Sequence, residues 1–312
     1  MGDAENILIR ALQRASQLSE RGGTGLRSVT RIMRTPAFEK AIKSLGPSVL
    51  RKALEGVICG PKASLGLEEL QQNGILHMML PSVARMVGFG GGSQGHKDLW
   101  GHTKKVVEQA DADPIIRWSA LFHDVGKVRT FAVWDDRISF HGHEVQSSRD
   151  FRSFCRGSKF FSLEEEDRIS QIIFYLGWVE AYESEWTDSA VRRLDKELGP
   201  ILNDVIRLSR ADITTGRDAK RERILRSIEA LVQRVEKLRA EAAAPRLPKG
   251  LGLVLAERFS IPVGKSLGEL ISKLDILIKA GKIPAGSNVE DCAKYVEDHQ
   301  DELLEQGELR TL

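Results

Sequence analysis

The sequence predicts an all-α fold, a multi-helix bundle with flanking helical segments. Over most of the 312 residues, apolar side chains recur at steps of three and four, the spacing that places them on one face of a helix. Strict alternation of apolar and polar residues, which marks a half-buried strand, is scarce. The strand-like exception is 129–140, RTFAVWDDRISF, which forms either a short β-hairpin around Asp135-Asp136 or an ordered loop.

Breaks in the helical pattern divide the chain into four predicted regions. A Gly-rich break at Gly22-Gly23 ends the first region, and AEAAAPRLPKG is typical of a linker before the last one. The predicted regions are an N-terminal helical extension at 1–34, a helical neck-like segment at 35–92, a domain that carries the histidines at 93–241, and a small C-terminal helical unit at 250–312.

Composition excludes several classes of protein. Apolar residues make up 41% of the chain and charged residues 29%, as in a globular protein rather than a disordered one. The net charge of +2 is too small to indicate nucleic-acid binding by itself. No stretch resembles a membrane span or a secretory signal, and the three cysteines are too far apart for a disulfide framework or a thiolate zinc site. We therefore expect a cytoplasmic protein without a membrane partner, and the oligomeric state is left open.

Histidines gather in one part of the sequence. Five of the seven lie in a short stretch, at His96, His102, His123, His141 and His143. Two of these and one aspartate continue apolar helical stripes, so we expect their side chains to point inward. The stripes are Leu99–His102–Val106, Ile116–Ala120–His123 and Ile201–Val205–Leu208–Asp212.

Two imidazoles and two carboxylates that face one core predict a metal site. A buried carboxylate is costly unless an opposite charge lies beside it. Histidine nitrogen and carboxylate oxygen suit Mn, Ni, Mg, Fe or Zn, and the pattern does not distinguish these ions. We expect Gly126 to end its helix, so that two consecutive residues reach one ion. The predicted ligands are His102, His123, Asp124 and Asp212.

Each of these groups also has a structural alternative. A lone histidine on an apolar stripe is more often a hydrogen-bonded core residue than a ligand. Asp212 has Arg210 and Arg217 near it in the sequence and could form an ion pair instead. The metal site is the better interpretation because four such groups occur together in this arrangement.

The same residues resemble a known family. His102, His123-Asp124 and Asp212 match the H…HD…D pattern of the HD superfamily of metal-dependent phosphohydrolases, and HDVGK, which ends in Lys127, strengthens the match. The chain is more closely similar to the HD-containing C-terminal part of bacterial CCA-adding enzymes (tRNA nucleotidyltransferases), over most of 38–298. The stretches that carry this similarity are HKDLWGHT, RWSALFHDVGK, FHGHE, WTDSAVRRLDKELG and LSRADITT.

Two departures from those enzymes shape the expectation. Nothing before position 38 resembles their nucleotidyltransferase head, with its Gly-Ser loop and paired aspartates. We therefore expect a free-standing HD module that does not add CCA by itself. Tyr175 and Leu176 stand where many relatives have a further histidine. One metal ion is thus the primary expectation, and a second depends on His141 and His143.

A metal site of this kind suggests roles for individual residues. Asp124 would orient or deprotonate the attacking water besides binding the metal, and Lys127 would neutralise charge on the phosphate. His141 and His143 would hold a second metal or the phosphate, because an i, i+2 pair in extended chain shares one face. Arg129 would complete the anion-binding rim with them. The alternatives are a solvated Lys127 and exposed loop histidines. His96 would either cap the helix of His102 or act as a further ligand.

The expected activity is hydrolysis of phosphoester bonds in nucleotides or at RNA 3′ ends. By resemblance, the substrate classes are 2′,3′-cyclic phosphodiesters, 2′-nucleotides and phosphomonoesters, with tRNA as a candidate partner. The segment from Arg217 to Arg239 contains eight basic and four acidic residues. These basic residues either follow a phosphate backbone or form a solvated helix face. Two other functions remain open: a non-catalytic tRNA-binding or assembly module, and hydrolysis of a free dNTP or signalling nucleotide. The sequence does not say whether a separate nucleotidyltransferase chain is a partner.

Overall fold

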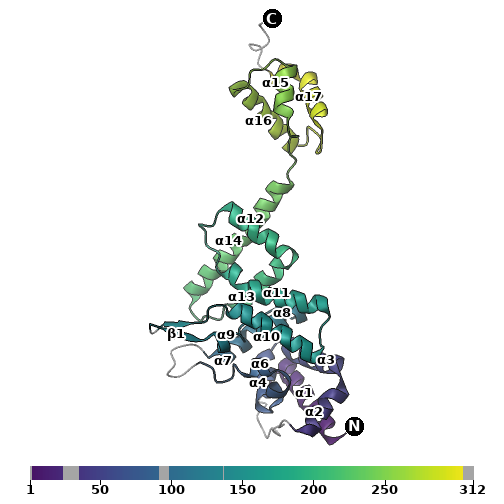
Figure 1. The fold of residues 1–312 in the computed structure, drawn as a ribbon, viewed down its shortest axis with the longest axis vertical. Helices are drawn as coiled ribbons and strands as arrows, with labels where there is room; N and C mark the ends of the chain where they lie inside the picture. Colours follow the sequence, from purple (N-terminus) through teal and green to yellow (C-terminus); the bar gives the residue numbers. More distant parts are fainter. Residues whose placement is uncertain (1, 24–34, 91–97, 136, 305–312) are drawn as a thin grey trace. The chain divides into compact units, whose positions relative to one another are not determined.

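Helices build almost all of the described chain, so the predicted all-α class is confirmed. The computed structural model describes residues 2–23, 35–90, 98–135 and 137–304 (Figure 1). The chain divides into two compact units, Met1–Val235 and Glu236–Leu312. The finer division into four regions stays a prediction. Within the described ranges, no helix is long and apolar enough to cross a membrane.

The strand-like stretch forms a β-hairpin rather than a loop. Strands β1 (Ala132–Trp134) and β2 (Arg137–Ser139) pair antiparallel, with Val133 opposite Ile138. Asp135 adopts a left-handed backbone conformation with φ of 46°, which the tight connection requires. Asp136 lies outside the described residues. The hairpin is the only sheet among the residues that the structure describes.

The larger unit begins with six helices whose starts are set largely by proline. Pro36, Pro47 and Pro81 each occupy the first position of a helix. The fixed φ of proline suits the helix there, and a backbone N–H at this position would have no acceptor within the helix. This spacing of prolines explains why the segment is a set of short helices. The elements are α1 (Asp3–Arg21), α2 (Pro36–Leu45), α3 (Pro47–Ile58), α4 (Ala63–Gln72), α5 (Ile75–Met79) and α6 (Pro81–Ala84).

The following helices carry the histidines and acidic residues singled out above. Helices α7, α8 and α13 pack against one another, and α11 packs on both α8 and α13. The elements are α7 (Leu99–Gln109), α8 (Pro114–Phe122), α9 (Lys127–Thr130), α10 (His143–Ser158), α11 (Leu163–Glu180), α12 (Asp188–Leu198), a 3₁₀ turn (Gly199–Ile201), α13 (Leu202–Asp212) and α14 (Asp218–Ala243).

An aromatic core fixes the end of α8. Trp118, Phe122 and Phe151 are fully buried, and the Phe122 and Phe151 rings meet edge to face at 5.1 Å between centroids. Complete burial of such a side chain stabilises a fold by roughly 2–3 kcal/mol. Because Phe122 immediately precedes His123, this packing also fixes where the His123 imidazole emerges.

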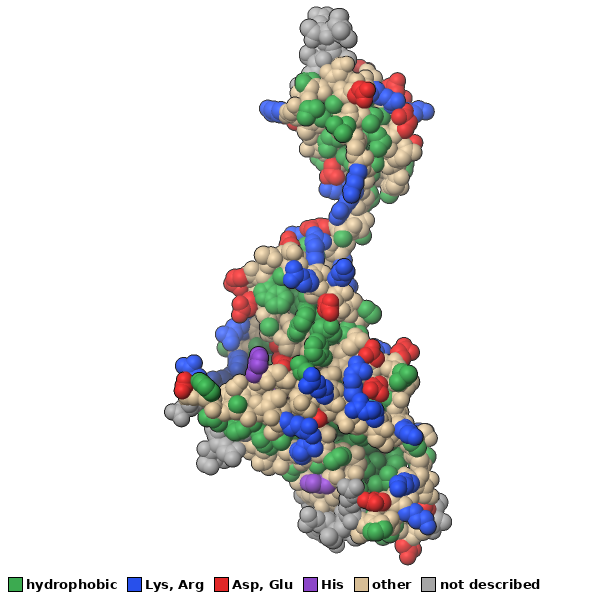
Figure 2. All heavy atoms as spheres, viewed as in Figure 1, with side chains coloured by type: hydrophobic (Ala, Val, Ile, Leu, Met, Phe, Trp, Pro, Cys, Tyr) green, Lys and Arg blue, Asp and Glu red, His purple; other side chains and the backbone are tan. Residues whose placement is uncertain are grey.

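The smaller unit has an apolar core of its own. It contains α15 (Leu251–Arg258), α16 (Lys265–Lys279), α17 (Val289–Asp298) and α18 (Gln300–Leu303). Leu255, Leu274, Ile278 and Val296 are fully buried in this core. On the face of the molecule drawn in Figure 2, Lys and Arg side chains lie interspersed with Asp and Glu, in keeping with the small net charge.

A bidentate ion pair connects α3 to α11. The Arg51 guanidinium donates to both carboxylate oxygens of Glu165 at 2.8 and 2.6 Å, and it also donates to Glu55 at 2.7 Å. The hydrogen bonds from Arg51 lower the pKa of Glu165 to about 2. Bidentate pairs of this kind hold two elements in a defined geometry more firmly than single contacts do.

We expect Glu165→Gln to destabilise the protein more at neutral pH than in acid. An unfolded glutamate has a pKa of about 4.3, so the stabilisation is present above that pH and is lost as the pH falls toward 2. Because both side chains are partly solvated, the loss at pH 7 is about 1–2 kcal/mol. Thermal melts of both proteins at pH 7 and pH 3 test this. Asp167→Asn, in the exposed pair with Arg152, is the control. Equal melting temperatures of the wild-type protein and Glu165→Gln at pH 7 would contradict the prediction.

Candidate metal centre

Three helices bring together residues that are far apart in the sequence. His102 lies in the first turn of α7, His123 directly follows α8, and Asp212 is the last residue of α13. The Asp212 Oδ1 atom lies 3.0 Å from His102 Nε2 and 3.1 Å from His123 Nε2. One potential ligand atom from each of the three residues lies within 4.8 Å of the others, so this group could hold a metal ion.

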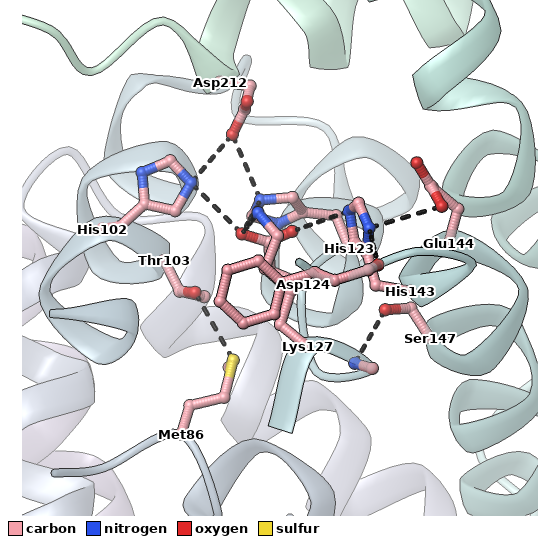
Figure 3. Close-up of polar contacts among 12 residues, drawn as sticks. Met86, His102, Thr103, His123, Asp124, Lys127, His143, Glu144, Ser147 and Asp212 are labelled. Atoms are coloured by element: carbon pink, nitrogen blue, oxygen red, sulfur yellow. Dashed lines mark hydrogen bonds and ion pairs between the residues drawn. The ribbon is translucent and has the colours of Figure 1, made fainter. Parts of the chain in front are cut away.

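Asp124 joins the same cluster from beside His123. Its Oδ2 atom lies 3.3 Å from His123 Nε2 and 3.5 Å from His102 Nε2 (Figure 3). The exposed fractions of the side chains are 1% for Asp124, 2% for His123, 14% for His102 and 24% for Asp212. The structure thus brings all four predicted ligands together, with one side of the cluster open toward solvent.

The imidazoles are oriented by hydrogen bonds on their far nitrogens. His123 Nδ1 lies 2.7 Å from the carbonyl oxygen of Ala120, and His102 Nδ1 lies 2.9 Å from Thr214 Oγ1. A carbonyl oxygen only accepts, so a neutral His123 carries its hydrogen on Nδ1 and turns the Nε2 lone pair toward the cluster. Such outer hydrogen bonds are typical of histidines that bind metals. Nothing in the sequence marked Thr214, because its contact is tertiary.

The charges in the cluster are strongly coupled. Burial alone would raise the pKa of Asp124, but the neighbouring His123 imidazole and the Lys127 ammonium reverse this and lower it. Burial likewise opposes ionisation of Asp212, and the close contacts of its carboxylate with His102 and His123 lower its pKa well below the usual range. Both carboxylates are therefore ionised at neutral pH, and they raise the pKa of His123 to about 10 against the effect of its burial. A metal ion would displace the His123 proton, because a ligating imidazole is neutral.

Unsatisfied polar atoms indicate how a cation would fit. His123 Nε2 and Asp212 Oδ1 are buried, and neither has a hydrogen-bond partner of good geometry among the described residues. An unsatisfied buried polar atom is costly. A divalent cation between two imidazole nitrogens and two carboxylates would satisfy both atoms, and this donor set is one that Mn, Fe, Ni and Zn accept. The residues present fit a metal ion.

Gly126 has a different role from the one predicted. Helix α8 ends at Phe122, and Gly126 has a φ of −66°, so it is not a left-handed helix cap. A Cβ at this position would lie 2.2 Å from the backbone oxygen of His143 and 2.7 Å from the backbone nitrogen of Ser147. Glycine is required because the start of α10 packs directly on this turn. The sequence did not predict this contact, because the β-hairpin separates Gly126 from α10 in the chain.

Lys127 lies beside the predicted ligands. Its Nζ atom donates to Asp124 Oδ2 at 2.7 Å, so it is paired rather than simply solvated. Lys127 begins α9 instead of ending a helix. The nearby Asp124 carboxylate outweighs the effect of burial and raises the pKa of Lys127. A protonated amine thus borders the cluster at neutral pH.

The residues suggested for a second ion separate in the structure. Gly142 has a φ of 73° and turns the chain, so His141 and His143 do not share one face of an extended segment as expected. His143 begins α10 and places Nε2 3.5 Å from Asp124 Oδ1, whereas His141 is exposed. Arg129 is half-exposed and lies 3.6 Å from Asp150. Of the three, the structure brings His143 to the cluster; His96 lies outside the described residues.

Tyr175 and Leu176 do not extend the cluster. The Tyr175 hydroxyl donates to Glu197 at 2.9 Å, and Leu176 is buried among apolar side chains. One turn further along α11, Glu180 lines a cavity that Asp212 also lines. Sequence reasoning did not single out Glu180, because a glutamate at a helix end is ordinarily solvated.

A cavity of about 470 Å³ opens onto the cluster. Its polar lining includes His102, Asp124, Asp212, Lys127 and Lys220, and its apolar walls include Phe89 and Phe140. This volume is in the range of small-molecule sites. Lys220, in the first turn of α14, was not predicted as a site residue; its helix had been noted only for its overall charge.

Parts of the chain are similar to tRNA nucleotidyltransferases. A stretch of 102 residues is 37% identical to the A-adding tRNA nucleotidyltransferase of Deinococcus radiodurans, covering 30% of this chain and 24% of that protein. A stretch of 182 residues is 28% identical to the CC-adding tRNA nucleotidyltransferase of Thermus thermophilus, covering 55% and 40%. For the multifunctional CCA protein of Thioalkalivibrio sulfidiphilus, the identity is 28% over 153 residues, covering 47% and 37%.

The comparisons define a relation and its limits. The chain matches no protein-family model, and each matched stretch spans less than half of the relative's own length. The chain is thus related to CCA-adding enzymes at low identity over part of its length, as the sequence motifs predicted. The assignment to the HD superfamily stays a prediction.

Proposed function

We propose that this chain is a divalent-metal-dependent phosphohydrolase of the HD type that acts on phosphoester bonds of nucleotides or RNA ends. The observation that carries the proposal is the convergence of His102, His123 and Asp212 ligand atoms within 4.8 Å, with Asp124 beside them. The relatives named above act, by their names, on tRNA, which supports an RNA end as the substrate.

The proposed chemistry divides between the ion and the protein. A bound divalent cation would polarise a phosphoryl oxygen and lower the pKa of a nearby water. Asp124, which is ionised at neutral pH, would orient the attacking water or accept its proton. Lys127 borders the same cavity and would neutralise the charge that develops on the phosphate. His143 donates from Nδ1 to the carbonyl oxygen of Phe140, so its Nε2 lone pair faces the cluster and would help to hold a second metal ion.

Removing a ligand should remove the metal. We expect His102→Ala and Asp212→Ala to weaken binding of Mn²⁺ at least 100-fold, because each loses one donor of the set and outer partners alone change affinity 10- to 100-fold. Titration calorimetry of the purified proteins, with elemental analysis of the protein as isolated, measures this. His77→Ala is the matched control, since His77 is exposed on α5. Equal Mn²⁺ affinity in all four proteins would contradict the metal centre.

Activity requires its own experiment. The purified protein should hydrolyse at least one of a panel of 2′,3′-cyclic nucleotides, 2′-nucleotides, mononucleotides, dNTPs and tRNA ends, with Mn²⁺, Ni²⁺ or Mg²⁺ added. Turnover of dNTPs alone would instead favour a free-nucleotide hydrolase. No turnover together with tight binding of tRNA would favour a non-catalytic RNA-binding module and would reject the hydrolase.

A further inference from the structure

Two cavities meet at the candidate metal centre. The first is the cavity of about 470 Å³ that holds Lys127 and Lys220. The second has a volume of about 860 Å³ and lies toward α11 and α14. Asp212, Ile213 and Ile224 line both cavities. A substrate with its phosphate at the centre would therefore have space to extend into both cavities.

The first two turns of α14 contribute one positively charged side chain to the lining of each cavity. Lys220 lines the first cavity and Arg223 lines the second. Residues three apart lie on the same face of a helix, so this face of α14 looks onto the centre. Within the described ranges, neither side chain forms an ion pair. Arg226 and Arg234, further along α14, pair with Glu222 and Asp188 instead. The charges of Lys220 and Arg223, near the centre, are thus available to a ligand, whereas those of Arg226 and Arg234, further away, are neutralised by acidic side chains.

The second cavity contains an unsatisfied hydroxyl group. Ser209 is only 2% exposed, lines this cavity, and its Oγ atom has no hydrogen-bond partner among the described residues. A buried hydroxyl without a partner is costly, and a ligand in the cavity would supply one. This observation is independent of the charge on α14.

Acidic side chains limit what the second cavity accepts. Glu180, Glu183 and Glu185 line it together with Arg223. Carboxylates repel a chain of phosphates but accept hydrogen bonds from ribose hydroxyls and from amino groups of bases. The second cavity therefore suits a nucleoside with a single adjoining phosphate on Arg223. The first cavity, with Phe89 and Phe140 in its walls, suits a base that packs on aromatic rings.

We propose that the substrate is an oligonucleotide end that occupies both cavities, with the terminal nucleoside in the first cavity, its reactive terminal phosphate at the centre, and the preceding nucleoside in the second cavity. The substrate class is thus an RNA end of two or more nucleotides rather than a mononucleotide. Arg223 and Ser209 bind the part of the substrate that a mononucleotide lacks. This inference rests on the proposed function and deepens it.

The test compares two substrates that differ only in length. A tetraribonucleotide with a 2′,3′-cyclic phosphate end should be hydrolysed with a kcat/KM at least 10-fold above that of the mononucleoside 2′,3′-cyclic phosphate. Arg223→Gln should lower this preference about 10-fold, chiefly through the KM of the tetranucleotide, and Ser209→Ala should lower it about 3-fold. Arg226→Gln is the matched control, because it removes the same charge one turn further on from a residue that lines neither cavity, and it should leave the preference unchanged.

The outcomes separate this inference from the function on which it rests. Two results would overturn the two-cavity substrate without contradicting the hydrolase activity. One is an equal kcat/KM of the wild-type protein for both substrates, and the other is a preference that Arg223→Gln leaves unchanged. If neither substrate is hydrolysed, the proposed hydrolase activity is wrong, and binding of the tetranucleotide then tests the two-cavity substrate. Fluorescence anisotropy with the labelled tetranucleotide should show about 10-fold weaker binding by Arg223→Gln than by Arg226→Gln, and equal affinities would overturn it.

Discussion

Asp124→Asn should lower kcat/KM for phosphoester hydrolysis by roughly 10³-fold, within the range that a general base and its orientation supply. The substitution keeps the size of the side chain but removes the charge that faces His102 and His123 and pairs with Lys127. Asp212 remains to balance the imidazoles, so we expect the variant to fold. The measurements are steady-state kinetics on a 2′,3′-cyclic nucleotide with saturating Mn²⁺, and the helical circular dichroism signal of the same sample.

The same substitution at Asp113, at the opposite end of α8, provides the control. Asp113 caps the start of α8 and lies 3.1 Å from Arg207, away from the cavities. Asn also caps helices well, so Asp113→Asn should keep activity within about twofold of wild type. A folded, metal-loaded Asp124→Asn protein that retains more than a tenth of the activity would show that the carboxylate has no essential part in the reaction.

The inward direction of the ligands could be predicted because helical periodicity fixes it. His102 follows Leu99 by three residues and precedes Val106 by four, and both neighbours are buried, so the imidazole lies on the core side of α7. The same reasoning placed Asp212 on the inner face of α13. Periodicity also identified the all-α class. For the stretch 129–140 the short alternating pattern allowed a strand or a loop, and only the pairing of Val133 with Ile138 distinguishes them.

Contacts between distant segments could not be predicted in this way. Thr214 approaches His102 because α7 and α13 pack together, and no local pattern encodes that distance. Lys220 and Arg223 belong to a helix that the sequence described only by its excess of basic over acidic residues. Which of its cations have acidic partners depends on the tertiary structure. His141 and His143 were assigned to one face on the assumption of extended chain, and a single left-handed residue, Gly142, removes that relation.

Gly126 shows how closely packing and chemistry are connected in this turn. Its backbone N–H donates to the Ser147 hydroxyl at 2.9 Å, and its missing side chain lets the first turn of α10 approach. His143 lies in that first turn and faces Asp124. A displacement of α10 would therefore move His143 away from the candidate metal centre as well as disturb the core around Phe151.

Gly126→Ala should consequently reduce both stability and activity. The backbone conformation suits alanine, but the added Cβ would lie 2.2 Å from a backbone oxygen that has no flexible side chain to move aside. Overpacking of this kind costs about 1–3 kcal/mol, which lowers the melting temperature by roughly 3–9 °C for a unit of this size. Gly157→Ala, near the other end of α10, is the matched control because nothing lies within 4 Å of its Cβ. There, alanine should raise helix stability by up to about 1 kcal/mol. Equal melting temperatures for the two variants would mean that α10 does not pack on Gly126 in solution, and would remove the reason for placing His143 beside Asp124.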